Sequence, residues 1–232
     1  STKVFVLEVM GRHAGWIAAA GELANNNEQT FVHKILLPEI SFDEERFLSG
    51  VEQDVSEYGY SVIVASEGLK NKNGELYASS TEKDSFGHSQ LGGLAPKIAS
   101  LITDKLNLKN HWSVADYLQR SARHISSLTD IKQAVAVGEA AVKLAAEGKS
   151  GVMPIIKRIS NSPYEWVISE GDLNQIANEE KTLPKNFISN DGFGITEAGR
   201  NYLQPLIEGE SFPKFSNGTP LYEGLDLHLR KI

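Results

Sequence analysis

A strand, a tight turn and a helix follow one another at the front of the chain, in the stretch VFVLEVMGRHAGWIAAA. Residues 4–9 form a nearly continuous apolar run with β-branched members, which is typical of a strand covered on both faces. Residues 14–24 are helix formers, and Met10, Gly11 and Arg12 lie between the two segments. The stretch therefore predicts a strand-turn-helix unit whose turn lies at the carboxyl end of a buried strand.

This turn predicts a site for an anionic ligand. Backbone N–H groups and the positive end of the helix dipole lie where the helix begins, and the planar guanidinium of Arg12 suits a phosphate or a carboxylate. The alternative is that Gly11 and Gly15 only permit a tight turn and that Arg12 is a solvated surface charge.

Apolar strands alternate with amphipathic helices over roughly the first two thirds of the chain, which predicts a mainly parallel sheet. After the first strand, further strands are expected at 35–37, 61–65 and 111–118. The expected helices run from Ser41, with Glu44 in capping-box spacing, to Gly59; over 94–106; and from Thr129 or Asp130 through Glu147, with Gly148 beyond the end.

The last third of the chain differs in pattern, with short predicted elements followed by glycine- and proline-rich stretches. Short strands are expected near 151–156 and 164–168, a short helix near 173–177, helical spacing over 195–207, and a wrapping segment over 212–224. We therefore expect an α/β fold of three layers, with a mainly parallel sheet flanked by helices. Residues 1–150 would form its core, and residues 151–232 an irregular C-terminal extension of the same domain.

Composition narrows the class of protein. Of the 232 residues, 41% are hydrophobic and 23% charged, and no apolar stretch approaches the roughly 20 residues of a membrane span. The absence of cysteine excludes disulfides and thiolate chemistry and makes a reducing cytoplasm the expected location. A net charge of −7 argues against a nucleic-acid surface. The histidines lack metal-ligand spacing, and no GxSxG elbow or Walker loop is present.

Polar side chains follow the expected strands at the point where each strand ends. The third strand runs directly into Glu67, and the fourth leads into Arg120 and Arg123. In an open parallel sheet the carboxyl ends of the strands border the ligand crevice. Glu67 and the 10–12 turn should therefore open onto the same edge of the sheet.

A long polar segment separates the third strand from the next expected helix. Residues 68–93 read as a loop, and loops of this length in a compact domain are usually functional or disordered. Two interpretations stay open, a mobile cover over the cleft and a surface insertion.

Five sequence pieces together resemble a known family. They are LEVMGRHAGWIAAA, a strand that ends in SEG, SFGHSQLGG, DYLQRSARH, and the late NFISNDGFGITEAGR. In this order and with these separations they resemble the sugar-phosphate half of the 6-phosphofructokinases, and are closest to the long bacterial forms described as pyrophosphate-dependent. The resemblance spans essentially the whole chain.

The resemblance implies roles for residues that match the family motifs. The Met10, Gly11 and Arg12 turn is similar to a segment that holds fructose 6-phosphate, with Arg12 also close to the phosphoryl group in transfer and so the expected catalytic residue. Glu67 matches a carboxylate that accepts hydrogen bonds from sugar hydroxyls. Tyr117 and Arg120 match a YxxR pair that grips the 6-phosphate, a task suited to the bidentate geometry of arginine.

The resemblance also implies contacts between subunits. In shorter family members an arginine precedes each phosphate-binding motif and reaches across a subunit interface. Counting back places Lys3 and His111 at these positions, with Lys109 nearby, and none of the three is arginine. A homodimer or homotetramer is the expected assembly, since closed symmetry is the usual solution.

Motifs of the family's earlier half are missing from the 232 residues. They are a glycine-rich donor-phosphate loop, a GGDxS-like magnesium segment, and a TxDND motif whose aspartate removes the proton from the sugar 1-hydroxyl. We therefore expect the carboxyl-terminal portion of a longer protein, inactive by itself, whose extension packs partly toward the absent half. Mg²⁺ would be bound with the phosphoryl donor, mainly by that half.

In the full enzyme, the sugar C1 alkoxide would attack the terminal phosphorus of magnesium pyrophosphate, with catalysis by positioning and electrostatics. Three alternatives stay open: an ATP-dependent 6-phosphofructokinase, a non-catalytic sugar-phosphate-binding or regulatory module, and a nucleotide-binding or oligomerisation domain unrelated to phosphotransfer.

Overall fold

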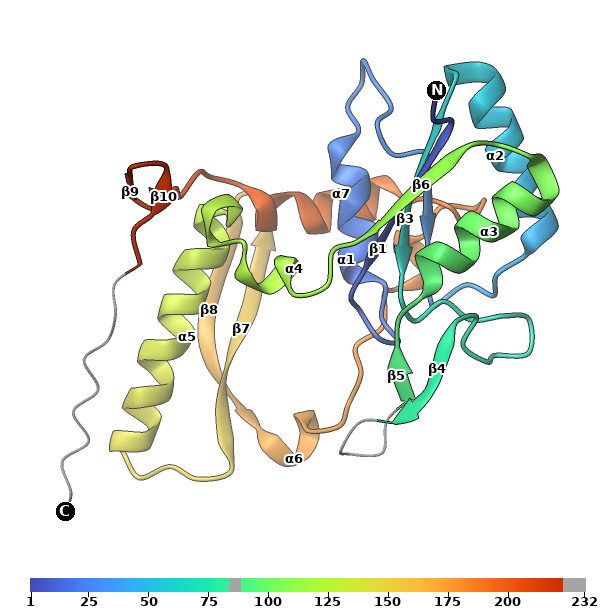
Figure 1. The fold of residues 1–232 in the computed structure, drawn as a ribbon. Coiled ribbons are helices and arrows are strands. Elements are labelled where there is room, and N and C mark those ends of the chain that lie inside the picture. Colours follow the sequence, from blue (N-terminus) through green and yellow to red (C-terminus); the bar gives the residue numbers. More distant parts are fainter. Residues whose placement is uncertain (84–88, 223–232) are drawn as a thin grey trace.

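A four-stranded parallel sheet forms the centre of the structure, a computed structural model that describes residues 1–83 and 89–222. The sheet has the order β2-β3-β1-β6 (Figure 1) and comprises β1 (Val4–Val9), β2 (Lys34–Leu36), β3 (Ser61–Ser66) and β6 (Asn110–Val114). β1 and β3 run in register along their whole length. The prediction of a mainly parallel sheet is confirmed.

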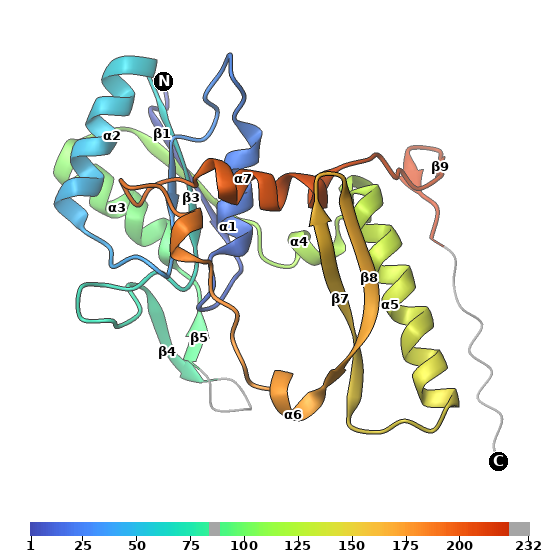
Figure 2. The same cartoon turned by 180° about the vertical axis from the view of Figure 1, so that it is seen from behind.

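Helices cover both faces of this sheet (Figures 1 and 2). On one face lie α2 (Glu44–Tyr58) and α3 (Leu94–Leu106), and on the other lie α1 (Trp16–Ala20) and α7 (Glu197–Leu203). Because side chains alternate along a strand, β1 contributes Val6 to the first core and Val9 to the second. The expected three-layer α/β fold is thus confirmed.

A helix and a β-hairpin stand beside the sheet (Figure 1). The hairpin strands β7 (Val152–Asn161) and β8 (Tyr164–Asp172) pair antiparallel, and α5 (Leu128–Ala146) packs on them. The short helices α4 (Leu118–Ser121) and α6 (Leu173–Ile176) lie at the two connections to this unit. After it the chain returns to the sheet, where Leu183, Ile188 and Leu203 join the same core as Val9.

The remaining described elements are short. They are the strand pairs β4 (Ser79–Lys83) with β5 (Ser89–Leu91) and β9 (Phe215–Ser216) with β10 (Thr219–Pro220), and the 3-10 turns η1 (Gly21–Ala24), η2 (Arg123–Ile125), η3 (Lys185–Phe187) and η4 (Gln204–Ile207).

Two helix starts differ from the sequence-based expectation. α2 begins at Glu44, not Ser41, because the Asp43 carboxylate accepts a hydrogen bond from the Arg46 amide, 3.1 Å away. α5 is capped by Ser127, whose hydroxyl accepts from the Asp130 amide at 3.0 Å, rather than by a later residue. The expected end of α2 at Gly59 is correct, whereas α5 ends at Ala146, one residue before the expected Glu147. Gly59 and Gly148 both have left-handed backbone angles.

Other boundaries also differ. The helix expected over 14–24 is a five-residue α1 followed by the 3-10 turn η1, and the strand expected over 111–118 ends at Val114, before α4. The segment 68–93 holds the hairpin strands β4 and β5 and is not structureless where it is described. Residues 84–88, which include the whole SFGH part of SFGHSQLGG, lie outside the described residues.

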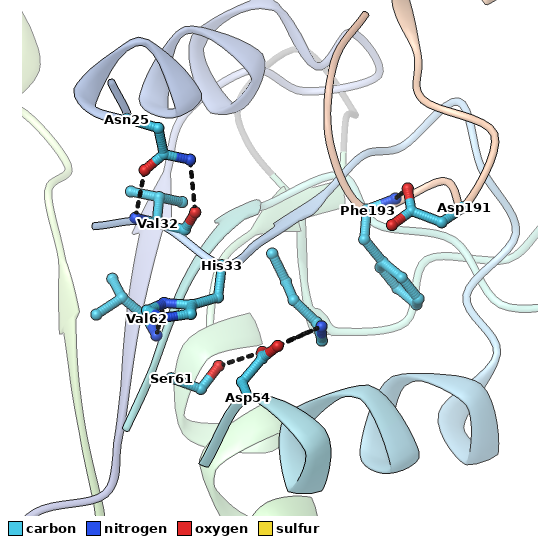
Figure 3. A network of polar contacts seen from close by, with 9 residues as sticks. Asn25, Val32, His33, Asp54, Ser61, Val62, Asp191 and Phe193 are labelled. Atoms are coloured by element: carbon cyan, nitrogen blue, oxygen red, sulfur yellow. Dashed lines mark hydrogen bonds and ion pairs between the residues drawn. The ribbon is translucent and has the colours of Figure 1, made fainter. Parts of the chain in front are cut away.

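A buried ion pair secures the amino-terminal ends of β2 and β3 (Figure 3). The ammonium of Lys34 lies 3.0 Å from the Asp54 carboxylate on α2, and the Ser61 hydroxyl donates to the same carboxylate at 2.8 Å. Beside it, the amide of Val62 donates to Nδ1 of His33. These contacts join α2 to the amino-terminal ends of β2 and β3. Removing one partner would leave a buried charge without compensation, which is strongly destabilising.

The carboxyl ends of β1 and β3 continue into turns that touch each other. A Cβ atom placed on Gly68 would lie 1.4 Å from the carbonyl oxygen of Arg12, so only glycine permits this approach. The close contact brings the turn after β3 directly against the turn after β1.

The buried carboxylate of Glu8 on β1 caps the amino-terminal end of α3. Glu8 is 1% exposed, and its Oε2 accepts a hydrogen bond from the Ala95 amide, 2.8 Å away in the first turn of α3, where Gly93 offers no side-chain cap. Burial raises the pKa of Glu8, an effect that the Ala95 hydrogen bond opposes and the charge of Glu67 increases.

We predict that Gly68→Ala lowers the free energy of unfolding by about 2 kcal/mol or more, because the added methyl group displaces the Arg12 carbonyl. Urea denaturation measures the change. Gly138→Ala is the matched control: Gly138 is inside α5 with nothing within 4 Å of a built Cβ, so this variant should gain roughly 0.5 to 1 kcal/mol. Equal stabilities of the two variants would contradict the close contact.

A second prediction concerns pH. Because the pKa of Glu8 is raised above its ordinary value of 4.5, the folded state binds the proton more tightly, so Glu8 stabilises the fold below pH 4.5 and loses that contribution as the pH rises through the folded pKa. The stability of the wild type minus that of Glu8→Gln should therefore fall with increasing pH, by at most about 1.4 kcal/mol per unit. Urea denaturation at several pH values measures the difference; parallel curves would refute it.

Candidate functional site

An open cleft of about 1180 Å³ lies at the carboxyl ends of β1 and β6, between the sheet and the start of α5. It is lined by all six residues predicted to bind substrate: Met10, Gly11, Arg12, Glu67, Tyr117 and Arg120. They come from three segments far apart in the sequence. The structure thus brings together the predicted set, while their roles stay predictions.

Two side chains hold the turn after β1 by its backbone. The amide N–H of Met10 donates to Gln119 Oε1 at 2.8 Å, and those of Gly11 and Arg12 both donate to Glu67 Oε1, at 3.2 and 3.1 Å. Arg12 itself has a left-handed φ of 49°. In this structure the side chains of Gln119 and Glu67 occupy these backbone N–H groups, so an anion at this turn would be held by side chains, and the predicted anion site stays a prediction.

The start of α1 is likewise occupied. The Gly15 amide donates to Glu39 Oε1 at 2.9 Å, and the same oxygen accepts from the Leu183 amide at 2.8 Å. Glu39 thus supplies the negative charge that a helix N-terminus favours, and α1 has only five residues. An anion beside the start of α1 must therefore be held by side chains rather than by its backbone N–H groups.

The Tyr117 and Arg120 pair lies at the start of α4. Tyr117 is 66% exposed, and the Arg120 guanidinium lies 5.4 Å from the centre of its ring, a cation–π arrangement. Both residues line the cleft. The arrangement suits a phosphate ester, which Arg120 can bind through two parallel hydrogen bonds.

Charges of both signs line the cleft. Arg12, Arg120 and Lys181 supply positive charge, whereas the carboxylates come from Glu8, Glu67, Asp116, Asp130 and Glu180. Glu67 Oε1 serves the turn, and Oε2 remains an acceptor of the kind that sugar hydroxyls require. The cleft can therefore hold a ligand that carries both an anionic group and hydroxyl groups.

The structure adds cleft residues that sequence reasoning missed. Gln119 could have been found, because it stands between Tyr117 and Arg120 in DYLQRSARH. The sequence indicated His13 less strongly, only by its position next to Arg12; its Nε2 lies 3.9 Å from Glu180 Oε1. Others had none, because they come from the start of α5 or from the extension: Ser127, Asp130, Glu180, Lys181, Leu206 and Ile207.

The three predicted trans-subunit residues do not line the cleft. The Lys3 amide donates to the Lys109 carbonyl at 2.8 Å, and the Lys3 ammonium donates to the Gly59 carbonyl at 3.1 Å. His111 is exposed on β6 opposite Phe5. All three lie toward the amino ends of the strands, away from their own chain's cleft, so a contact with another subunit stays a prediction.

Neither a metal centre nor a membrane span is found among residues 1–83 and 89–222. No three Asp, Glu or His side chains gather there as a metal site requires. No helix of these residues is long and apolar enough to cross a bilayer.

Comparisons with known proteins give matches over most of the chain. A family model described as Phosphofructokinase matches residues 1–145. Pyrophosphate--fructose 6-phosphate 1-phosphotransferases of Halomonas elongata and Methylococcus capsulatus are 55% and 56% identical to this chain, over 98% and 96% of its length and 54% and 53% of theirs. The chain thus spans about half the length of these curated relatives.

A solved structure has the same fold. The crystal structure of a pyrophosphate-dependent phosphofructokinase from Nitrosospira multiformis matches with a TM-score of 0.84 and 52% identity, over 96% of this chain and 52% of that one. Sequence and fold agree, and the family model covers more than half of the chain. This chain belongs to the phosphofructokinase family.

Proposed function

We propose that this chain is the sugar-phosphate-binding portion of a phosphotransferase that moves a phosphoryl group from pyrophosphate to the 1-hydroxyl of fructose 6-phosphate. One observation carries the proposal: Arg12, Glu67, Tyr117 and Arg120 meet in one cleft although they come from separate segments. The names of the relatives that are 49% to 56% identical support pyrophosphate, rather than ATP, as the donor.

Each residue has a distinct task in this proposal. Tyr117 and Arg120 bind the 6-phosphate, and Oε2 of Glu67 accepts hydrogen bonds from the sugar hydroxyls. Arg12, whose backbone is held by Glu67, places positive charge beside the phosphoryl group in transfer. Most of the rate acceleration would come from such positioning and charge stabilisation. The Mg²⁺ and the proton acceptor for the 1-hydroxyl would come from residues outside this chain.

The proposal extends to organisation and assembly. Residues 151–232 would belong to one domain with residues 1–150, which the burial of Leu183, Ile188 and Leu203 in the sheet's core supports. The longer protein would act in the cytoplasm as a homodimer or homotetramer, with Lys3, Lys109 and His111 at the cleft of a neighbouring subunit.

The binding role is tested on the 232-residue chain. We expect fructose 6-phosphate to bind without pyrophosphate turnover, and Arg120→Ala to weaken binding by about 10- to 100-fold, because a charge-assisted pair of hydrogen bonds is lost. Isothermal titration calorimetry measures both, with fructose as the ligand that lacks the phosphate. Arg46→Ala on α2, outside the cleft, is the control and should bind as the wild type does. Equal affinity for fructose and its 6-phosphate would refute the assignment.

The catalytic role is tested in a protein of the relatives' length. Arg12→Ala should lower kcat by about 100-fold or more, since it removes a charge beside the reacting phosphoryl group. Arg120→Ala should mainly raise the KM for fructose 6-phosphate. Steady-state kinetics with pyrophosphate and with ATP separate the two effects and identify the donor. A normal kcat for Arg12→Ala would remove that residue from the mechanism.

A further inference from the structure

Gln119 connects two parts of the cleft that lie 109 positions apart in the sequence. It stands on α4 between Tyr117 and Arg120, and its Oε1 accepts the hydrogen bond of the Met10 amide at 2.8 Å. Glu67 holds the amides of the next two residues of the same turn. The turn that carries Arg12 is therefore fixed from two sides, by the end of β3 and by α4.

This hydrogen bond also fixes the orientation of the Gln119 carboxamide. A backbone N–H can only donate, so only the carbonyl oxygen of Gln119 can face Met10, and the NH₂ group must point away from the turn. Gln119 lines the cleft. Among the residues that the structure describes, its Nε2 has no hydrogen-bond partner, although NH₂ carries two donors.

The surroundings indicate what these donors meet. Tyr117, Gln119 and Arg120 all line the same cleft, so Gln119 lies among the residues proposed to grip the 6-phosphate. A phosphate ester has more acceptor oxygens than one guanidinium can satisfy. A neutral amide fits such a place because it serves the Met10 donor with one end and an anion with the other.

We propose that Gln119 is a further substrate-binding and positioning residue: its oxygen sets the position of the Arg12 turn, and its NH₂ donates to a phosphate oxygen of a bound sugar phosphate. The donor role rests on the proposed function, whereas the positioning role does not. Through this one side chain, the distance between the Arg12 turn and the Arg120 segment is set before the ligand arrives.

Two variants of the 232-residue chain separate the two roles. Gln119→Glu keeps an oxygen for the Met10 amide but replaces the donor by a negative charge. Gln119→Met keeps the shape and loses both functions. The matched controls are Gln53→Glu and Gln53→Met, because Gln53 is an exposed glutamine on α2 outside the cleft.

Hydrogen exchange of the Met10 amide, followed by NMR, reports the positioning role without any ligand. We expect Gln119→Glu to retain the wild-type protection and Gln119→Met to exchange at least about tenfold faster, as for loss of one hydrogen bond. The Gln53 variants should leave the rate unchanged. Unaltered exchange in Gln119→Met would overturn the positioning role.

Calorimetry with fructose 6-phosphate reports the donor role. We expect both Gln119 variants to bind about tenfold or more weakly than the wild type, with Gln119→Glu the weaker because its charge repels the phosphate. Wild-type affinity in Gln119→Glu would overturn the donor role alone. If the wild-type chain protects the Met10 amide from exchange but binds no sugar phosphate, the binding function proposed for this chain is overturned, and the donor role with it. The positioning role would still be supported.

Discussion

The contact between the turns after β1 and β3 is the constraint on which the cleft depends. One oxygen of Glu67 accepts two consecutive amides, and the missing side chain of Gly68 lets the Arg12 carbonyl approach. The left-handed backbone of Arg12 is an unfavourable conformation that this contact sustains. Without it, neither the direction of Arg12 nor the shape of this edge of the sheet would be defined.

A second carboxylate, that of Glu39, also accepts two backbone hydrogen bonds with one oxygen, where the segment after the hairpin returns to the sheet. Glu39 binds the start of α1 and the returning segment at Leu183 with one oxygen, and the Trp16 indole donates to the Lys181 carbonyl at 2.6 Å. The returning segment forms one wall of the cleft. The position of this wall is therefore tied to the helix that follows the Arg12 turn.

Sequence reasoning succeeded where a local pattern is compatible with only one type of secondary structure. The β-branched runs of β1 and β3 could only be buried strands, and Gly59 and Gly148 ended helices because glycine adopts left-handed angles without strain. It failed at helix starts such as α2, where Ser41 and Asp43 both offer a capping oxygen. The choice between them depends on how the chain leaves the preceding strand, which local sequence does not specify.

The candidate site divides in the same way. The sequence by itself indicated the layered parallel sheet, because the apolar, β-branched runs of β1 and β3 need cover from other elements, and it determined which residue types stand at the strand ends. Only the tertiary structure decided that Glu67 and Gln119 consume the backbone donors of the Arg12 turn. Hydrogen-bond partners separated by 55 to 109 positions are chosen by packing, and no local pattern encodes them.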